Sequence, residues 1–304
     1  MRRQVVVAIV AGAGLVFGLG FVVWAGSQGL IGFGGGAKRL LRLADRAVQH
    51  GDWSLAGAKL EELVGTFPDS PWTDDGLFKL GQVYEHQQHL LEARATYRLL
   101  LERFPSSPLT AQAQTRLGAV NVAVFFSPTA TELDLTYQVK SGDTLAKIAE
   151  EHRTTVEALK KANGISSDVI RPAQKLKVPK GRFSIVVDKS QNQLLLTEDD
   201  QFFKAYPVAT GQSNSTPVGT FKIVNKIANP VWYRQGAIVP PDSPQNILGT
   251  RWLGLDKPGY GIHGSVDASG IGKQITAGCV RMHNQDVEEL YAVVPLGTPV
   301  TIVD

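Results

Sequence analysis

The 304-residue sequence contains a single cysteine, Cys279, and no run of five like charges. One cysteine excludes an internal disulfide framework and any structural zinc site that needs two or more thiolates. The 31 basic and 28 acidic residues nearly cancel, which leaves a net charge of +3. Because neutralising phosphates requires a concentrated basic face, this balance argues against a nucleic-acid-binding protein. With 43% hydrophobic and 19% charged residues, the chain is also too apolar for a disordered polyelectrolyte.

Long hydrophobic runs are scarce, and the one clear case is Val5–Trp24, with 20 residues and no charge. A helix of that length spans about 30 Å, the thickness of a bilayer core. Arg2 and Arg3 precede the run, which predicts a cytoplasmic N-terminus and an exported remainder. A signal peptide cleaved before Gly26 is the alternative. We therefore predict a membrane anchor and Gly-rich leash over residues 1–36, with the bulk of the chain periplasmic or extracytoplasmic.

Residues 37–128 show helical patterning with an internal repeat of 37 residues. Phe67-Pro68 recurs as Phe104-Pro105, and Leu80-Gly81 recurs as Leu117-Gly118. Because proline cannot continue a helix, each Phe-Pro is expected to close one. A helix pair repeating at this length resembles the tetratricopeptide family, whose usual period is about 34 residues. The resemblance implies an all-α repeat region, which either binds an envelope protein partner or only positions the rest of the chain.

Residues 136–180 carry the pattern strand, helix, helix, strand. The segment opens with Val-x-x-Gly-Asp-Thr-Leu from Val139 and closes with Ile-x-x-x-Gln-x-Leu-x-Val-Pro from Ile170. With Asn163 between them, these motifs resemble a lysin-motif (LysM) module. One departure is Ala173, where the family often has glycine.

The LysM resemblance implies a small βααβ fold that binds glycans containing N-acetylglucosamine, such as the glycan strands of peptidoglycan. In that family the sugar lies between the first strand–helix turn and the second helix–strand loop. The corresponding candidate residues in this sequence are Gly142, Asp143, Thr144 and Ile165. A module that keeps the fold without tight binding is the alternative.

Short strands and turns fill residues 183–304 and predict a mostly-β domain. It contains the only cysteine, and His263 lies 16 residues before it. A thiol becomes a nucleophile where a histidine takes its proton and an acceptor fixes the other ring nitrogen. The amides of Gly278 and Cys279 are candidates for an oxyanion hole, and Arg281 is suited to a carboxylate. From the residues alone, a buried and inert cysteine remains the alternative.

The stretch Gly-Ile-His-Gly-Ser, followed by Thr-Ala-Gly-Cys-Val-Arg-Met-His-Asn, resembles the signature of the L,D-transpeptidase catalytic domain. The resemblance implies that Cys279 is the nucleophile and that His263 is the general base. It also implies that a backbone carbonyl orients the histidine, at Gly264 or Ser265.

Other positions of this signature match the family less uniformly. Thr276 stands where serine is frequent and keeps the hydroxyl. Ala277 stands where many members have a second histidine, which leaves one evident base. Arg281 is implied to hold the motif loop or a substrate carboxylate. Aromatic residues that are candidates for the substrate cleft, with a place in the core as the alternative, are Trp232, Trp252 and Tyr260.

The expected fold class is therefore multidomain, with a transmembrane helix, an all-α repeat region, a βααβ LysM module and a mostly-β catalytic domain. The expected function is L,D-transpeptidation of peptidoglycan stem peptides in the cell envelope. By the resemblance, Cys279 displaces the terminal D-Ala of a tetrapeptide stem, and an amine of a second stem resolves the thioester into a 3→3 cross-link. Water or a protein amine as acceptor, and a non-catalytic wall-binding scaffold, are the alternatives. No metal and no organic cofactor is implied.

Overall fold

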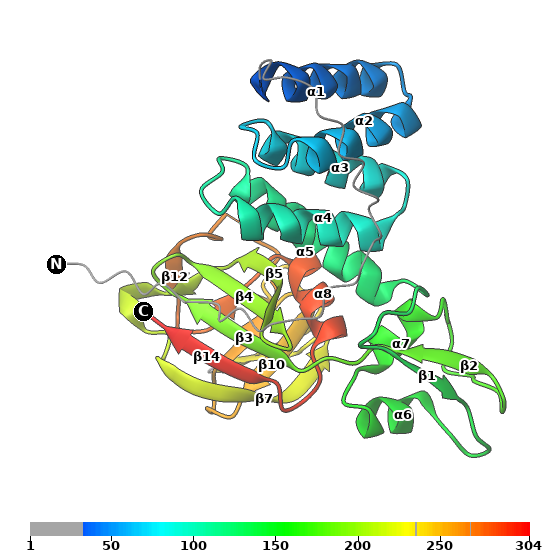
Figure 1. The fold of residues 1–304 in the computed structure, drawn as a ribbon. Helices are drawn as coiled ribbons and strands as arrows, with labels where there is room; N and C mark the ends of the chain where they lie inside the picture. Colours follow the sequence, from blue (N-terminus) through cyan, green and yellow to red (C-terminus); the bar gives the residue numbers. More distant parts are fainter. Residues whose placement is uncertain (1–32, 235, 268) are drawn as a thin grey trace. The chain divides into compact units, whose positions relative to one another are not determined.

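The computed structural model describes residues 33–304 except residues 235 and 268, and these fold into two units, residues 33–110 and 111–304 (Figure 1). The predicted membrane segment Val5–Trp24 lies outside the described residues. Within the described part, every helix is too short or too polar to cross a bilayer. The predicted fold class is corrected on this point. The described chain consists of helical repeats, a LysM module and a mostly-β domain, without a transmembrane helix.

The first unit contains four helices, and each packs against the next. They are α1 (Phe33–Gln49), α2 (Trp53–Thr66), α3 (Thr73–His86) and α4 (Leu90–Arg103). The two Phe-Pro pairs end helices as predicted, because Phe67 and Phe104 are the C-cap residues of α2 and α4. Gly81 of α3 allows the buried ring of Tyr97 to approach, since a Cβ there would lie 2.5 Å from that ring. The residues that recur in the sequence therefore end helices or allow neighbouring helices to pack closely.

The LysM module has the predicted βααβ order. Its elements are β1 (Leu135–Gln138), α6 (Leu145–Glu151), α7 (Val156–Ala162) and β2 (Lys175–Val178). The two strands pair antiparallel. Thr144 and Thr155 cap the two helices, with Oγ1 atoms that accept hydrogen bonds from the amides of Lys147 at 3.2 Å and Ala158 at 2.9 Å. These caps fix where each short helix begins.

An eight-stranded sheet forms the mostly-β domain (Figure 1). Its strands, in spatial order, are β13 (Val280–Arg281), β11 (Gly261–His263), β10 (Arg251–Leu255), β7 (Gly219–Ala228), β14 (Pro299–Val303), β3 (Phe183–Asp188), β4 (Gln193–Glu198) and β5 (Gln201–Pro207). Two neighbouring pairs are parallel, β11 with β13 and β14 with β3, and the others are antiparallel.

Smaller elements complete this domain. They are the paired strands β6 (Thr210–Gly211) and β12 (Gln274–Thr276), the hairpin of β8 (Trp232–Arg234) and β9 (Ala237–Val239), the 3-10 turn η1 (Gln212–Asn214), and helix α8 (Asn284–Val293). Alternate residues of β3, Ile185 and Val187, are buried in the core together with Val287 and Leu290 of α8. The core therefore lies between the sheet and α8.

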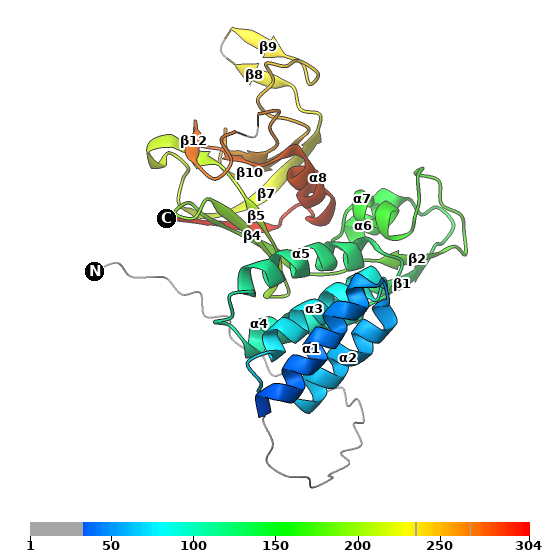
Figure 2. The same ribbon diagram turned by 90° about the horizontal axis from the view of Figure 1, so that it is seen from above.

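Helix α5 (Thr110–Phe126) covers the edge strand β5 (Figure 2). Phe125 makes edge-to-face contacts with Phe183 and Phe203, at ring-centroid distances of 5.5 and 5.8 Å. The amide Nδ2 of Asn121 donates to the carbonyls of Phe202 at 3.2 Å and Phe203 at 2.8 Å. An open edge strand exposes unpaired carbonyls, and here a helix satisfies two of them. The sequence pattern assigned this helix to the repeats, whereas the structure packs it with the second unit.

Candidate active site

A cleft of about 560 Å³ opens in the mostly-β domain. Its lining includes three side chains that the sequence singled out for chemistry, His263, Cys279 and Arg281, together with Thr276. Of the three candidate aromatic residues, Trp232 and Trp252 line the cleft. Tyr260 does not, because it packs against the hydrophobic core.

The parallel pairing of β11 with β13 explains why the thiol and the imidazole open on the same cleft. Ile262 is opposite Val280 in this register, and both side chains are buried in the core. Successive side chains of a strand point to opposite faces. His263 and Arg281, the next residues along each strand, therefore face away from the core, and so does Cys279, which immediately precedes Val280.

His263 is almost completely buried, and its Nδ1 lies 2.7 Å from the carbonyl oxygen of Gly264. A carbonyl accepts only, so Nδ1 carries the proton and Nε2 is left as the basic nitrogen. Burial lowers the pKa of His263 to about 4, which keeps the ring neutral at neutral pH. Of the two carbonyls proposed to orient the ring, Gly264 makes this contact. Ser265 instead donates its hydroxyl to the carbonyl of Asp267 at 2.6 Å.

The indole ring of Trp252 stacks on the imidazole ring of His263. It is opposite His263 in the β10–β11 register, and the two rings stack with centroids 6.0 Å apart and planes 20° apart. The indole is itself fixed, because its Nε1 donates to Oδ1 of Asn225 at 3.1 Å. Gly261 makes room for it, since a Cβ there would lie 2.6 Å from the indole ring. Trp252 therefore both orients His263 and excludes water from it.

Replacing Trp252 by alanine is expected to raise the pKa of His263 from about 4 toward its ordinary value of about 6.5, because the ring gains water. The check is an NMR titration of the His263 ring resonances in the wild type and the variant. Trp252→Phe is the matched control, which retains a stacking ring and is expected to stay close to the wild type. An unchanged pKa in Trp252→Ala would show that the indole does not shield the imidazole.

Cys279 carries a free, half-buried thiol. Its Sγ lies 3.6 Å from the carbonyl oxygen of Gly259, an acceptor for the S–H proton. Burial raises the pKa of the thiol, and this outweighs the opposite effects of the Gly261 backbone and of Arg281. The resting site therefore combines a neutral thiol with a neutral imidazole, not a thiolate–imidazolium pair.

The loop before Cys279 is fixed by the hydroxyl of Thr276. Its Oγ1 donates to the carbonyl of Cys279 at 2.7 Å and accepts from the amide of Gly278 at 3.2 Å. Gly278 has a φ of +139°, which strongly favours glycine, and a Cβ there would lie 2.9 Å from the ring of Tyr260. The amide of Gly278, a candidate oxyanion donor, is thus engaged within the loop. The ring of Tyr260 packs against this loop at Gly278 and does not line the cleft.

Arg281 is tied to the domain by its backbone, because its amide and carbonyl both pair with Ala209 at 2.8 Å. Arg281 lines the cleft, and within the described residues its buried Nε has no hydrogen-bond partner. A buried donor without a partner carries a free-energy cost of about 1–3 kcal/mol. A carboxylate bound in the cleft would remove that cost.

The sequence did not identify the apolar wall of the cleft. This wall comes largely from residues around the β8–β9 hairpin, which projects from the domain in Figure 2, and includes Val231, Tyr233, Ile247 and Leu248. Buried Asn246 holds the base of the hairpin, since its Nδ2 donates to the carbonyls of Pro230 at 2.9 Å and Pro240 at 3.1 Å. The available signal was the concentration of prolines and apolar residues in a stretch without strand alternation.

The predicted glycan contacts in the LysM module fall into two groups. Asp143 and Thr144 are engaged in the turn before α6, where the Asp143 carboxylate accepts from the amide of Lys140 at 2.7 Å and from the hydroxyl of Tyr137 at 2.8 Å. Gly142 gives that turn its positive φ of +83°. Ile165 lies elsewhere, in a hollow of about 630 Å³ lined by α7 and the loop after it. The structure does not bring all four residues into one hollow.

Three family models match the chain in the predicted order. A tetratricopeptide repeat matches residues 75–107, a LysM domain matches residues 137–179, and the L,D-transpeptidase catalytic domain matches residues 182–302. The LysM and catalytic domains together imply binding to peptidoglycan and association with the cell wall.

Several relatives carry the name L,D-transpeptidase. A Bacillus licheniformis protein named L,D-transpeptidase YkuD is 41% identical over 176 residues, covering 55% of this chain and 98% of that protein. Its Bacillus subtilis namesake is 38% identical over 175 residues, with the same coverage. The Escherichia coli L,D-transpeptidase YbiS is 34% identical over 113 residues, covering 32% of this chain and 37% of that protein. This chain is therefore an enzyme that belongs to the L,D-transpeptidase family.

Proposed function

We propose that the protein cross-links peptidoglycan stem peptides by acyl transfer through Cys279, with His263 as the general base. The observation that carries this proposal is the fixed histidine. Its Nδ1 is bound to the carbonyl of Gly264, and its Nε2 remains to accept the thiol proton on the face that Cys279 shares.

In the first half-reaction the Sγ of Cys279 attacks the carbonyl carbon between the third stem residue and the terminal D-Ala. The thiol proton passes to Nε2 of His263, which suits a base that starts neutral. When the C–N bond breaks, the same proton goes to the leaving amine of D-Ala, and a thioester to Cys279 remains. In the second half-reaction an amine of another stem attacks the thioester and gives its proton to His263. When the C–S bond breaks, His263 passes that proton to the leaving sulfur, so that the new amide, the free thiol of Cys279 and the neutral imidazole remain.

The lining of the cleft supports this substrate class. Arg281 offers a buried donor without a partner among the described residues, which suits a carboxylate of the stem peptide. The wall with Val231 and Leu248 is apolar and suits the aliphatic part of a diamino acid. Ala277, exposed at the cleft, adds no second base.

The proposal is tested by incubating the protein with disaccharide-tetrapeptide fragments of peptidoglycan and following the products by mass spectrometry. We expect a Cys279 adduct that lacks the terminal D-Ala, followed by a dimer with a 3→3 link. Adding a competing amine separates the acceptors. A tripeptide product that persists in excess amine would indicate water as the natural acceptor, and absence of both adduct and product would overturn the proposal.

A further inference from the structure

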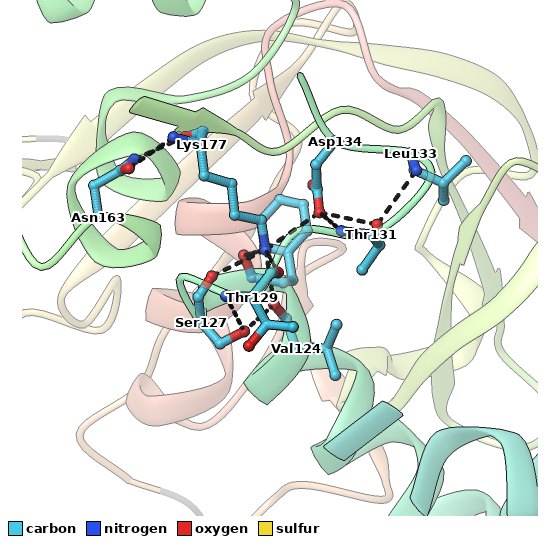
Figure 3. A network of polar contacts seen from close by, with 9 residues as sticks. Val124, Ser127, Thr129, Thr131, Leu133, Asp134, Asn163 and Lys177 are labelled. Carbon is cyan, nitrogen blue, oxygen red and sulfur yellow. Dashed lines mark hydrogen bonds and ion pairs between the residues drawn. The ribbon is translucent and has the colours of Figure 1, made fainter. Parts of the chain in front are cut away.

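Lys177 of the LysM module has an unusual environment for a lysine. On β2, Leu176 and Val178 are buried in the LysM core, so the alternation of the strand directs Lys177 to the opposite face. A lysine on that face would ordinarily be solvated, as its neighbour Lys175 is. The side chain of Lys177 is instead only 6% exposed. It enters a polar pocket formed by segments outside the module (Figure 3).

The ammonium group of Lys177 has its hydrogen-bonding capacity filled by that pocket. Its Nζ donates to the carbonyl oxygens of Val124 at 3.0 Å, Ser127 at 2.9 Å and Thr129 at 2.8 Å, and the carbonyl of Phe125 lies at 3.5 Å, so acceptors are available for all three protons. Asp134, whose side chain is 5% exposed, supplies the countercharge at 3.3 Å. Val124 lies in the last turn of α5, where the helix dipole is negative, and its carbonyl also accepts from the amide of Ser127 at 3.1 Å. Lys177 therefore caps α5.

The backbone of Lys177 is fixed equally firmly inside the LysM module. Oδ1 of Asn163 accepts from the amide of Lys177 at 2.7 Å, and its Nδ2 donates to the carbonyl of Lys177 at 2.7 Å and to that of Leu159 at 2.8 Å. Asn163 thus ties β2 to the end of α7 and aims the lysine side chain at α5 (Figure 3). One residue joins the module to a helix outside it.

Helix α5 in turn belongs to the mostly-β domain, through the contacts of Asn121 and Phe125 with β5 and β3. A second contact repeats the pattern at another helix end. The hydroxyl of Thr155, which begins α7, donates to the carbonyl of Ala292 in the last turn of α8, and Ala158 of α7 is buried in the core of the catalytic domain. The LysM module therefore donates hydrogen bonds to carbonyls in the last turns of two helices outside it, α5 and α8.

From these contacts we propose that Lys177 holds the LysM module and the catalytic domain as one rigid body, and so positions the cleft relative to the bound glycan strand. This inference rests on the proposed function. Domains joined by a linker are expected to move unless their interface prevents it. A rigid connection of fitting length raises the effective concentration of a second site, whereas a mobile one dilutes it. A fixed distance between the two sites favours stem peptides that lie at that distance from the bound glycan. Lys177 is therefore a positioning residue.

The test uses the full chain and the variant Lys177→Met, which keeps the length of the side chain and leaves the pocket carbonyls and Asp134 without their cation. Lys175→Met is the matched control, because Lys175 is exposed on the same strand. Three quantities are measured: the tumbling of each domain by ¹⁵N relaxation, D-Ala release from soluble disaccharide-tetrapeptide, and D-Ala release from intact sacculi.

For Lys177→Met we expect the LysM module to tumble independently, with the rate on the soluble fragment within about twofold of wild type. On sacculi we expect a loss of about tenfold in rate, because only the polymer uses both sites together. Lys175→Met is expected to match the wild type in all three measurements. A released module with an undiminished rate on sacculi would overturn the positioning role. Joint tumbling that persists in Lys177→Met would overturn the role of Lys177 as the residue that holds the two domains together, and independent tumbling in the wild type would overturn the rigid connection itself.

Two further outcomes are separable. If the wild type is inactive on both substrates, the proposed function fails, while the relaxation measurement still decides whether Lys177 joins the domains. If Lys177→Met does not fold, Asp134→Asn decides by the same three readouts, since it removes the countercharge and keeps the lysine. Joint tumbling in Asp134→Asn together with wild-type rates on sacculi would then count against the proposal.

Discussion

Cys279→Ala protein is expected to release no D-Ala from disaccharide-tetrapeptide, a loss of about 10⁴-fold or more. The chain has no other cysteine, so no neighbouring thiol can take over the attack. The hydroxyl of Thr276 is occupied within the loop by the carbonyl of Cys279 and the amide of Gly278. Initial rates of D-Ala release, together with intact-mass detection of the acyl adduct, measure this effect.

Two controls make the result specific to the nucleophile. Cys279→Ala should still be retained on sacculi, because the LysM module is untouched. Cys279→Ser is expected to lose nearly as much activity as alanine, since a serine hydroxyl is a far weaker nucleophile beside a single neutral imidazole. A Cys279→Ala protein that keeps a tenth of the wild-type rate would rule out the thiol as the acyl carrier.

The parts of this structure that the sequence predicted correctly are those encoded locally. The turn Gly-Asp-Thr caps a helix through a hydroxyl three residues before the amide it binds, and that spacing is visible in the chain. The two Phe-Pro pairs end helices for an equally local reason. In the site, the motif singles out His263 and Cys279 as candidates, and the pairing of β11 with β13 puts both on the face away from the core, while their catalytic roles stay a prediction.

Contacts between residues far apart in the chain determine which elements a helix packs against, and the sequence pattern does not predict them. Gly81 and Gly118 occupy equivalent positions of the repeat, yet they serve different neighbours. A Cβ at Gly81 would meet the ring of Tyr97, whereas one at Gly118 would lie 2.9 Å from the side chain of Lys204 on β5. The repeat pattern therefore continues into α5, while the packing of α5 is that of the second unit. The similarity between the repeats therefore predicts that a helix forms there, but not which elements that helix packs against.

Lys177 illustrates the same limit for a charged residue. Its strand alternates lysine with apolar residues, the pattern of a sheet with one solvated face. That pattern is identical for Lys175, which is exposed, and for Lys177, which is buried. The difference arises from carbonyls of Val124, Ser127 and Thr129, about 50 residues earlier in the chain. No local signal distinguishes the two lysines.

His263→Ala is expected to lower kcat/KM for D-Ala release by about 10²–10⁴-fold, because the attacking thiol loses its only evident proton acceptor. His283 offers the matched control. It lies four residues after Cys279 and precedes α8, where its side chain makes no capping hydrogen bond. His283→Ala is expected to retain nearly full activity. Equal losses in the two variants would show that the base had been assigned to the wrong histidine.

The pH dependence of the wild-type enzyme tests the same base without a substitution. Acylation needs a neutral imidazole, and burial lowers the pKa of His263 to about 4. Protonation below that pH removes the base, so kcat/KM should fall only as the pH drops through about 4. Since burial raises the pKa of Cys279, the profile should stay level across neutral pH. An acid limb near 6.5 would mean a hydrated histidine, and a rise through neutral pH would mean that a preformed thiolate, not the neutral pair, is the reacting form.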